Sequence, residues 1–241
     1  LRLARRLDQY GWTPVIMTPE PESVFRKMPA MDPTLQVPDI ETHHVAAWVP
    51  STRIARTLAR LPHPLASAGN RLLSASLFPD QYREWMGAAR RHARRIDAFD
   101  IVWVTGGPFG IFLSGAAIAR DRNVPLVLDY RDPWTTGEDL PRSMVAPLFG
   151  GLHRLESKLL QQATGVAYVN ADMRDRNLGA FGRPDPAIWR VIPNGFDPLD
   201  VGHAAPTAFS EPTVIYAGAC YASRSMTPVL EALGKADSVG L

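Results

Sequence analysis

The sequence predicts an α/β protein built on a doubly wound parallel sheet. Short apolar runs alternate with helical patterns of ten or more residues, as expected for parallel strands joined by crossover helices. Hydrophobic residues make up 46% of the 241 residues and charged residues 21%, which are the proportions of a globular protein rather than a disordered chain. A chain of this length can bury a substantial core in one large or two modest domains.

The strands and helices are expected in alternation along the chain. The predicted strands are Pro14–Thr18, Leu35–Val45, Asp100–Thr105, Pro125–Asp129, Gly165–Val169, Trp189–Ile192 and Thr213–Ala217. The predicted helices are Thr52–Leu61, Asp80–Ile96, Ile111–Arg122, Met144–Gln162, Ala171–Phe181 and Thr227–Ala236. The polar, proline-containing run after Met17 and the run from Leu61 to Asp80 interrupt this rhythm and are expected to be loops, the second ending at Asp80 as an N-cap.

The two ends suggest a piece of a longer protein. The opening run LRLARRLDQYGW is typical of the last turns of a helix that stops at Gly11, and a parallel α/β domain is expected to place a strand before it. A stretch poor in large apolar residues predicts a linker at 198–212, between a first domain, 1–197, and the start of a second, 213–241.

Composition excludes several classes of protein. Cys220 is the single cysteine, so an intramolecular disulfide framework and a cysteine-rich metal site are impossible. The chain has no run of about 20 apolar residues and no signal-peptide pattern, which favours a cytoplasmic protein, either soluble or peripheral to a membrane. His43 and His44 lack a third ligand at metal spacing, so no metal is expected, and the net charge of +2 does not favour nucleic-acid binding.

Polar and glycine residues gather where predicted strands end, the usual place for ligands in an open parallel sheet. Gly106, Gly107 and Pro108 follow one strand and precede a helix whose N-terminus favours an anion; the alternative is an ordinary strand-to-helix turn. Asp129, Arg131 and Asp132 follow the next strand, where the arginine would be held between carboxylates. The alternative is a structural salt-bridge cluster with Trp134 as its lid.

Two further strand ends carry turn chemistry. Asn194 and Gly195 form an Asn-Gly turn signal after a short strand, which is also compatible with a plain turn. Gly218 ends the last predicted strand, and Arg224 precedes a helix. A glycine turn, an arginine and a helix N-terminus together suggest a phosphate-binding site.

Taken in order, these segments resemble the amino-terminal half of a glycosyltransferase family 4 enzyme with the GT-B fold. The resemblance covers roughly residues 78–236 and rests on FPDQYREW, FDIVWVTGGPFG, LVLDYRDPWT, RLESKLLQQATGVAYVN, VIPNGFDP and YAGACYASRSMTPVLEAL. It implies two Rossmann-like domains, the first binding the acceptor and the second a nucleotide-diphosphate sugar, usually without a metal or other cofactor. Asp129, Arg131 and Asp132 would be catalytic, and Gly218 and Arg224 would bind the donor diphosphate.

The same resemblance implies the reaction. A sugar would pass from the nucleotide donor to an acceptor hydroxyl with retention, in the synthesis of glycans, glycolipids or cell-envelope polysaccharides, with Gly106, Gly107, Pro108, Trp134, Asn194 and Gly195 near the acceptor. Ala219 stands where many members carry an arginine, and the Glu-x7-Glu segment is expected beyond residue 241, so the 241 residues alone are expected to be inactive. A nucleotide-sugar epimerase of the same fold and a binding module without turnover are the alternatives.

The helix expected from residue 80 carries Arg83, Arg90, Arg91, Arg94 and Arg95 together with His92. This basic stripe suggests contact with an anionic membrane at the inner face of the plasma membrane, where a lipid-linked acceptor would lie; the alternative is a solvated basic face. Trp12, Trp48 and Trp189 are expected in packing, and Glu156 and Lys158 on the polar face of a helix.

Overall fold

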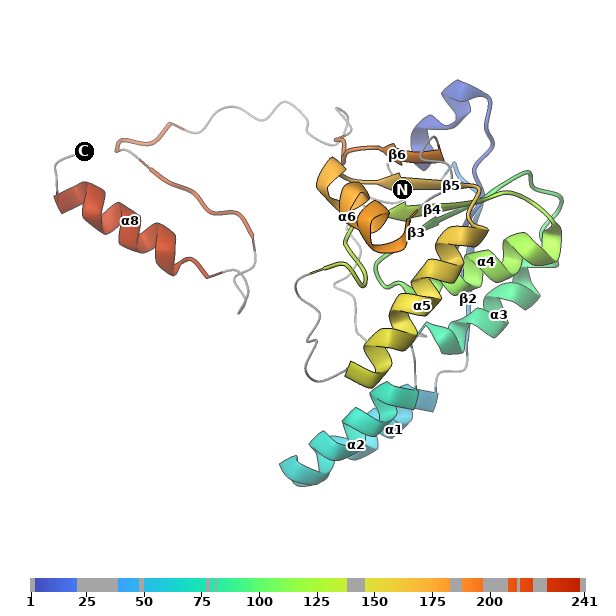
Figure 1. Cartoon of the computed structure of the whole chain (residues 1–241), viewed down its shortest axis with the longest axis horizontal. Coiled ribbons are helices and arrows are strands. Elements are labelled where there is room, and N and C mark those ends of the chain that lie inside the picture. Colours follow the sequence, from blue (N-terminus) through green and yellow to red (C-terminus); the bar gives the residue numbers. More distant parts are fainter. Residues whose placement is uncertain are drawn as a thin grey trace. The chain divides into compact units, whose positions relative to one another are not determined.

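The computed structural model describes residues 3–20, 39–47, 50–76, 79–80, 82–137, 146–182, 188–196, 208–211, 213–218 and 225–238. The chain forms two compact units, Leu1–Asp200 and Val201–Leu241 (Figure 1). Each unit is described by itself below.

Four parallel strands form the main sheet of the first unit. They are β3 (Val102–Thr105), β4 (Leu126–Tyr130), β5 (Gly165–Tyr168) and β6 (Trp189–Val191), and they lie side by side in chain order. Thr105 pairs with Asp129, and Asp129 in turn with Ala167. All four strands confirm predicted runs and, with the helices between them, confirm the predicted Rossmann-like α/β class. Because parallel strands share one direction, their carboxyl ends meet at a single edge.

Three crossover helices pack on one face of this sheet. They are α4 (Gly110–Arg122), α5 (Ala146–Gln162) and α6 (Ala171–Phe181), each linking neighbouring strands. Right-handed crossovers between strands in sequential order place their helices on the same side. Alternate strand residues, among them Val104, Leu128 and Tyr130, meet these helices in the main hydrophobic core. Successive strand residues point to opposite faces, so Asp129 points away from this core.

A second pair of parallel strands and a helix form a smaller core. Strands β1 (Ile16–Pro19) and β2 (Thr42–Val45) pair with each other, and α3 (Arg83–Ala93) packs beside α4. Trp85 is buried, and its indole Nε1 donates a hydrogen bond to the Val45 carbonyl oxygen at 3.0 Å. This bond fixes the start of α3 against the end of β2.

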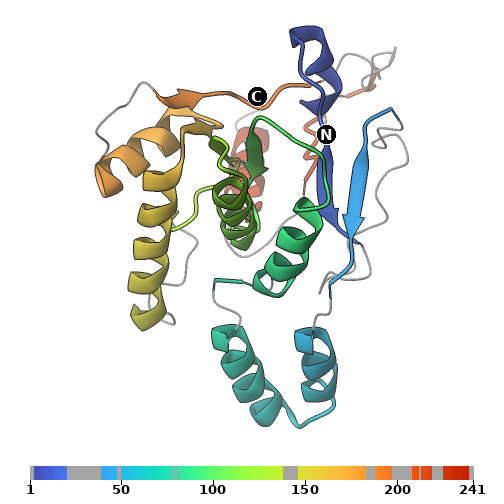
Figure 2. The same cartoon turned by 90° about the vertical axis from the view of Figure 1, so that its right-hand side faces the viewer.

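Helices α1 (Pro50–Leu58) and α2 (His63–Ser76) form an antiparallel hairpin. Figure 2 shows it extending from the rest of the first unit. The loop prediction for 61–80 was therefore wrong over α2. Gly69 of α2 has no side chain, so Leu58 of α1 packs directly on it and the two helices lie close together. At the base of the hairpin, the buried Ser51 hydroxyl donates to Glu84 Oε2 at 2.6 Å.

The two ends of the chain differ from the predicted elements. The opening segment forms two short 3₁₀ turns, Ala4–Arg6 and Asp8–Tyr10, instead of an α-helix, although Gly11 ends it as predicted, with φ of 77°. In the second unit, α8 (Thr227–Ser238) confirms the last predicted helix, whereas the predicted strand Thr213–Ala217 has no strand pairing and is exposed. Without a neighbouring strand, an apolar run gains no sheet hydrogen bonds.

Two glycines in helix interiors allow a matched test of packing. A methyl group on Gly115 in α4 would overlap the Val104 side chain of β3, whereas one on Gly179 in α6 would meet nothing within 4 Å. Gly115→Ala should lower the free energy of unfolding by about 1–3 kcal/mol through overpacking. Gly179→Ala should raise it by about 0.5–1 kcal/mol through helix propensity. Urea unfolding of both variants checks this, and equal effects would contradict the close α4–β3 contact.

Candidate active site at the strand ends

Four residues meet at the carboxyl ends of β3, β4 and β6, and we call them the strand-end cluster: Thr105, Asp129, Arg131 and Asn194. Arg131 Nε donates to Asp129 Oδ2 at 2.9 Å, and the Thr105 hydroxyl donates to the same oxygen at 3.1 Å. Arg131 Nη1 donates to Asn194 Oδ1 at 2.9 Å. The structure thus joins two strand ends that are 63 residues apart in the sequence.

Burial divides the roles of the three charged residues. The Asp129 side chain is 2% exposed and that of Arg131 is 24% exposed. A buried carboxylate needs a paired cation because desolvation is costly, and Arg131 supplies it. Asp132, by contrast, is exposed. Asp129 is therefore placed to orient Arg131, while Asp132 offers its carboxylate to solvent.

The glycine turn after β3 lies beside this cluster. Gly106 N–H donates to the Asp129 carbonyl oxygen at 2.8 Å, and a Cβ at Gly106 would overlap the Phe112 ring. Gly107 has φ of 100° and is followed by a cis peptide bond to Pro108. A Cβ at Gly107 would lie 3.5 Å from Asp132 Oδ2. The predicted residues Gly107 and Asp132 are therefore neighbours in space.

The N-terminus of α4 is occupied by a carboxylate of the chain itself. Asp80 Oδ2 accepts from Gly110 N–H at 2.6 Å, and its Oδ1 accepts from Tyr82 N–H at 2.9 Å. Burial raises the pKa of the Asp80 carboxyl, and both backbone bonds oppose that rise. The sequence suggested this helix N-terminus as a place for a ligand anion. That expectation is corrected, because Asp80 already fills the position and satisfies the first amide.

Trp134 lies in the core instead of forming a lid over the charges. Its side chain is 5% exposed, and its ring stacks on Phe109 at 5.1 Å between centroids and 8° between planes. It also meets Phe112 edge-on at 6.3 Å. Trp134 therefore anchors the loop after β4 through aromatic packing, and it is too buried to serve as a platform for an acceptor.

Glu156 is a site-supporting residue that the sequence analysis missed. Expected on a polar helix face, it is fully buried, and its Oε2 accepts hydrogen bonds from the backbone N–H of Thr135, at 3.0 Å, and from the Thr135 hydroxyl. Burial raises the pKa of the Glu156 carboxyl, and the bonds from Thr135 oppose the rise. Glu156 lies four residues after Leu152 and four before Leu160, so it falls in the apolar stripe of α5. This spacing could have predicted its burial from the sequence.

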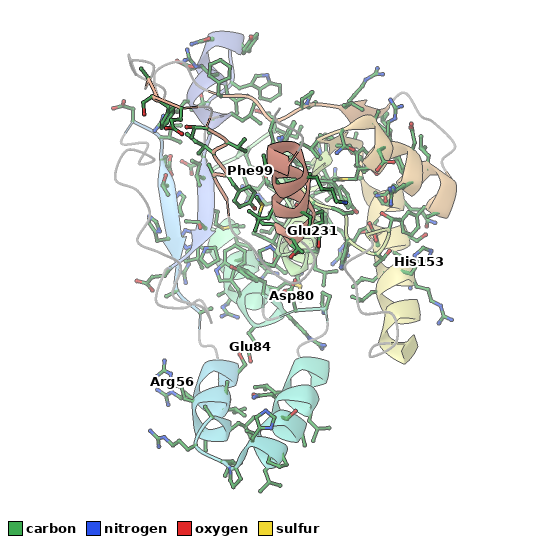
Figure 3. All side chains as sticks on the ribbon, turned by 90° about the vertical axis from the view of Figure 1, so that its left-hand side faces the viewer. Arg56, Asp80, Glu84, Phe99, His153 and Glu231 are labelled. Atoms are coloured by element: carbon green, nitrogen blue, oxygen red, sulfur yellow. The ribbon has the colours of Figure 1, made fainter. Side chains whose placement is uncertain are left out.

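A second polar anchor holds the next residue of the loop. The Thr136 hydroxyl donates to Asn177 Oδ1 of α6 at 2.6 Å, and Asn177 Nδ2 donates to the Tyr168 hydroxyl at 3.2 Å. The Nδ1 atom of His153 in α5 (Figure 3) lies 3.2 Å from the Thr135 hydroxyl oxygen. The His153 ring stacks on the Phe181 ring, with 4.4 Å between their centroids. Two helices thus hold the loop that carries Asp132.

The remaining predicted site residues are Gly195, Gly218 and Arg224. Gly195 is exposed, and a Cβ there would meet nothing within 4 Å. Gly218 belongs to the second unit, and Arg224 lies outside the described residues. Within the described part of the chain, no three His, Cys, Asp or Glu side chains come together as a metal site.

The fold and the edge define a class of protein. A parallel α/β sheet with a buried, paired carboxylate and an exposed carboxylate, Asp132, at its carboxyl edge is an arrangement typical of ligand-binding and catalytic domains. The family description that matches residues 1–195 is "Glycosyl transferase 4-like domain". Since the match spans most of the chain, this protein belongs to the glycosyl transferase 4-like family.

Neither the curated proteins nor the solved structures contain a significant match to this chain. Among the helices that the structure describes, none is long and apolar enough to cross a membrane.

The buried Glu156 predicts a pH-dependent effect on stability. Because the pKa is raised in the folded state, the folded protein binds this proton more tightly than the unfolded chain does. The ordinary pKa of a glutamate carboxyl is 4.5. The contribution of Glu156 to the free energy of unfolding therefore falls as the pH rises above that value. Glu156→Gln removes this titration, so its stability relative to wild type should increase with pH in that window, measured by urea unfolding at successive pH values.

Two further variants complete this test. Glu156→Ala should destabilise by about 1–3 kcal/mol for each Thr135 donor left without an acceptor. Lys158→Ala, exposed on the same helix, should change stability by less than about 0.5 kcal/mol. A stability difference between Glu156→Gln and wild type that does not vary with pH would contradict the burial of an ionisable carboxyl here.

Proposed function

We propose that this protein transfers a hexose-type sugar from a nucleotide-diphosphate sugar to an acceptor hydroxyl, with retention of anomeric configuration, and that the first unit binds the acceptor. The single observation that carries the proposal is the exposed Asp132 carboxylate beside Gly107, next to a buried Asp129–Arg131 pair, at the carboxyl edge of the sheet. Membership of the glycosyl transferase 4-like family supports transfer as the reaction class.

The charges suit the chemistry of glycosyl transfer. Positive charge develops at the anomeric carbon and negative charge on the leaving diphosphate. Asp132 would orient the acceptor hydroxyl or stabilise the developing cation. Arg131, held by Asp129 and Asn194, is a cation with a fixed position that would bind an anionic group of the acceptor or donor. Preorganised charges of this kind need no rearrangement during the reaction.

The second unit would supply the donor side. We propose that Gly218 and Arg224 bind the donor diphosphate through backbone N–H groups and the guanidinium group, without a metal ion. The acceptor would be a glycan or a lipid-linked sugar, in the synthesis of a glycan, glycolipid or cell-envelope polysaccharide. We expect no nucleic-acid partner for this protein.

Two alternatives keep the fold but change the function. A nucleotide-sugar epimerase would need a histidine and carboxylate pair at the site. A binding module without turnover would bind the same ligands but would show no transfer activity. Membership of the glycosyl transferase 4-like family favours transfer over both alternatives.

A lipid-linked acceptor would bring the enzyme to a membrane, and the α1–α2 hairpin supports this part of the proposal. Residues 50–76 contain four arginines and no acidic residue: Arg53, Arg56, Arg60 and Arg71. On α2, Leu65 and Leu72 lie two turns apart on one face and are 59% and 75% exposed. Basic and exposed aliphatic residues together suit the interface of an anionic bilayer, at the cytoplasmic side of the membrane.

The catalytic proposal is tested by Asp132→Asn in the full-length protein. We expect the turnover of a nucleotide-diphosphate sugar with acceptor to fall by about 10²–10⁴-fold, the usual contribution of a positioned acid–base group. Circular dichroism should stay unchanged because Asp132 is exposed. Asp175→Asn, an exposed carboxylate on α6, is the matched control and should keep full activity. Undiminished turnover in Asp132→Asn would remove this residue from the mechanism.

The membrane proposal is tested by cosedimentation with phosphatidylglycerol-containing vesicles. Leu65→Ser with Leu72→Ser should weaken vesicle binding at least about tenfold, because each inserted leucine contributes about 1.5–3 kcal/mol. Phe196→Ser, an exposed apolar residue of the same unit, should bind as wild type does. Equal binding by all three proteins would contradict docking through the hairpin.

A further inference from the structure

A solvent-open cavity of about 180 Å³ lies between β2 and α3, apart from the strand-end cluster. Two of the described residues that line it are arginines, and none is acidic: His44, Val45, Ala46, Ala88, Arg91, His92 and Arg95.

The spacing of residues on α3 explains the lining. Three residues follow Ala88 by three, four and seven positions, and these spacings put them on the same face of α3 and of the turn that ends it: Arg91, His92 and Arg95. The small side chain of Ala88 leaves room between that face and β2. The hydrogen bond from Trp85 to Val45 and the buried Ala89 hold α3 against the smaller core. The cavity is therefore formed by the ends of β2 and α3 and the residues that directly follow them.

The four arginines at the C-terminal end of α3 and directly after it, Arg90, Arg91, Arg94 and Arg95, divide into two pairs with different surroundings. Arg90 makes hydrogen bonds of 2.8–3.0 Å to both carboxylate oxygens of Asp121, and Arg94 lies 3.6 Å from the same carboxylate. The Arg90 and Arg94 charges are thus balanced by α4. Arg91 and Arg95 point to the cavity instead, and none of the described residues that line it carries a carboxyl group.

The carboxylate that directly precedes β2 in the sequence is already engaged. The His92 ring meets the His43 ring edge-on at 4.8 Å, and His43 Nε2 is 2.7 Å from Glu41 Oε1, so the Glu41 carboxylate contacts His43.

We propose that this cavity binds a phosphate-bearing anion through Arg91 and Arg95. Two guanidinium groups present planar N–H donors that match phosphate oxygens. The absence of a lining carboxyl group among the described residues removes the repulsion that an anion would otherwise meet. The site uses none of the residues of the strand-end cluster, so it does not depend on the proposed transfer reaction.

The test is calorimetric titration of the chain with inorganic phosphate and with pyrophosphate. Arg91→Gln with Arg95→Gln should weaken binding at least about tenfold, because both charge-assisted donors to the anion are removed. Arg94→Gln is the matched control on the same helix, since it removes one equal charge outside the cavity, and Arg154→Gln with Lys158→Gln on α5 removes two. Both controls should bind as wild type does, and the single variant Arg95→Gln should already differ from Arg94→Gln.

A second arm distinguishes the two sources of phosphate. Vesicles of phosphatidylcholine with phosphatidic acid are compared with vesicles of phosphatidylcholine alone. If the cavity variant binds phosphatidic acid vesicles more weakly than the α5 control does, the ligand is a lipid headgroup. If only pyrophosphate or phosphate binding is lost, the ligand is a soluble anion.

Three outcomes would overturn the proposal: no binding of phosphate, pyrophosphate or phosphatidic acid; equal binding by wild type and the cavity variant; or the same loss in the α5 control as in the cavity variant. Thermal unfolding of each variant confirms that the exposed substitutions leave the fold intact. Transfer activity and the effect of Asp132→Asn are measured separately, so failure here is distinguishable from failure of the proposed function.

Discussion

The ion pair between Asp129 and Arg131 is the interaction on which the candidate site depends. Asp129 is buried at the end of β4, on the face opposite the main helical core, where an unpaired carboxylate would be strongly unfavourable. Arg131 balances this charge and at the same time reaches Asn194 after β6. Removal of either charge would therefore disturb two strand ends at once, because the same guanidinium group connects them.

Three buried or partly buried carboxylates support this edge in the same way. Asp129 holds Arg131, Asp80 bonds the first amide of α4, and Glu156 bonds the backbone and hydroxyl of Thr135. Each fixes a backbone segment next to the candidate site, and Trp134 adds an aromatic anchor in the core. Sites placed on rigid, well-supported segments hold their geometry. Asp132 differs from these carboxylates because it is exposed, which suits a group that meets a substrate.

The basic character of the first unit is concentrated in separate places. On α3, Arg90 and Arg94 face Asp121, while Arg91 and Arg95 line the cavity beside β2. The α1–α2 hairpin carries further arginines together with exposed leucines and no acidic residue. A net charge of only +2 for the whole chain conceals this distribution, because acidic residues elsewhere cancel the total. Local surroundings, and not the net charge, decide where an anion can bind.

The sequence by itself determined the alternation of strands and helices, the family, and the residues at the strand ends, since hydrophobic periodicity and glycine turns are local properties. Only the tertiary structure showed that Arg131 joins Asn194, that Asp80 fills the N-terminus of α4, and that Trp134 and Glu156 are buried. The helix at 63–76 and the unpaired run at 213–217 were likewise decided by neighbours in space. Burial and long-range pairing depend on which segments meet, and a local pattern carries little of that information.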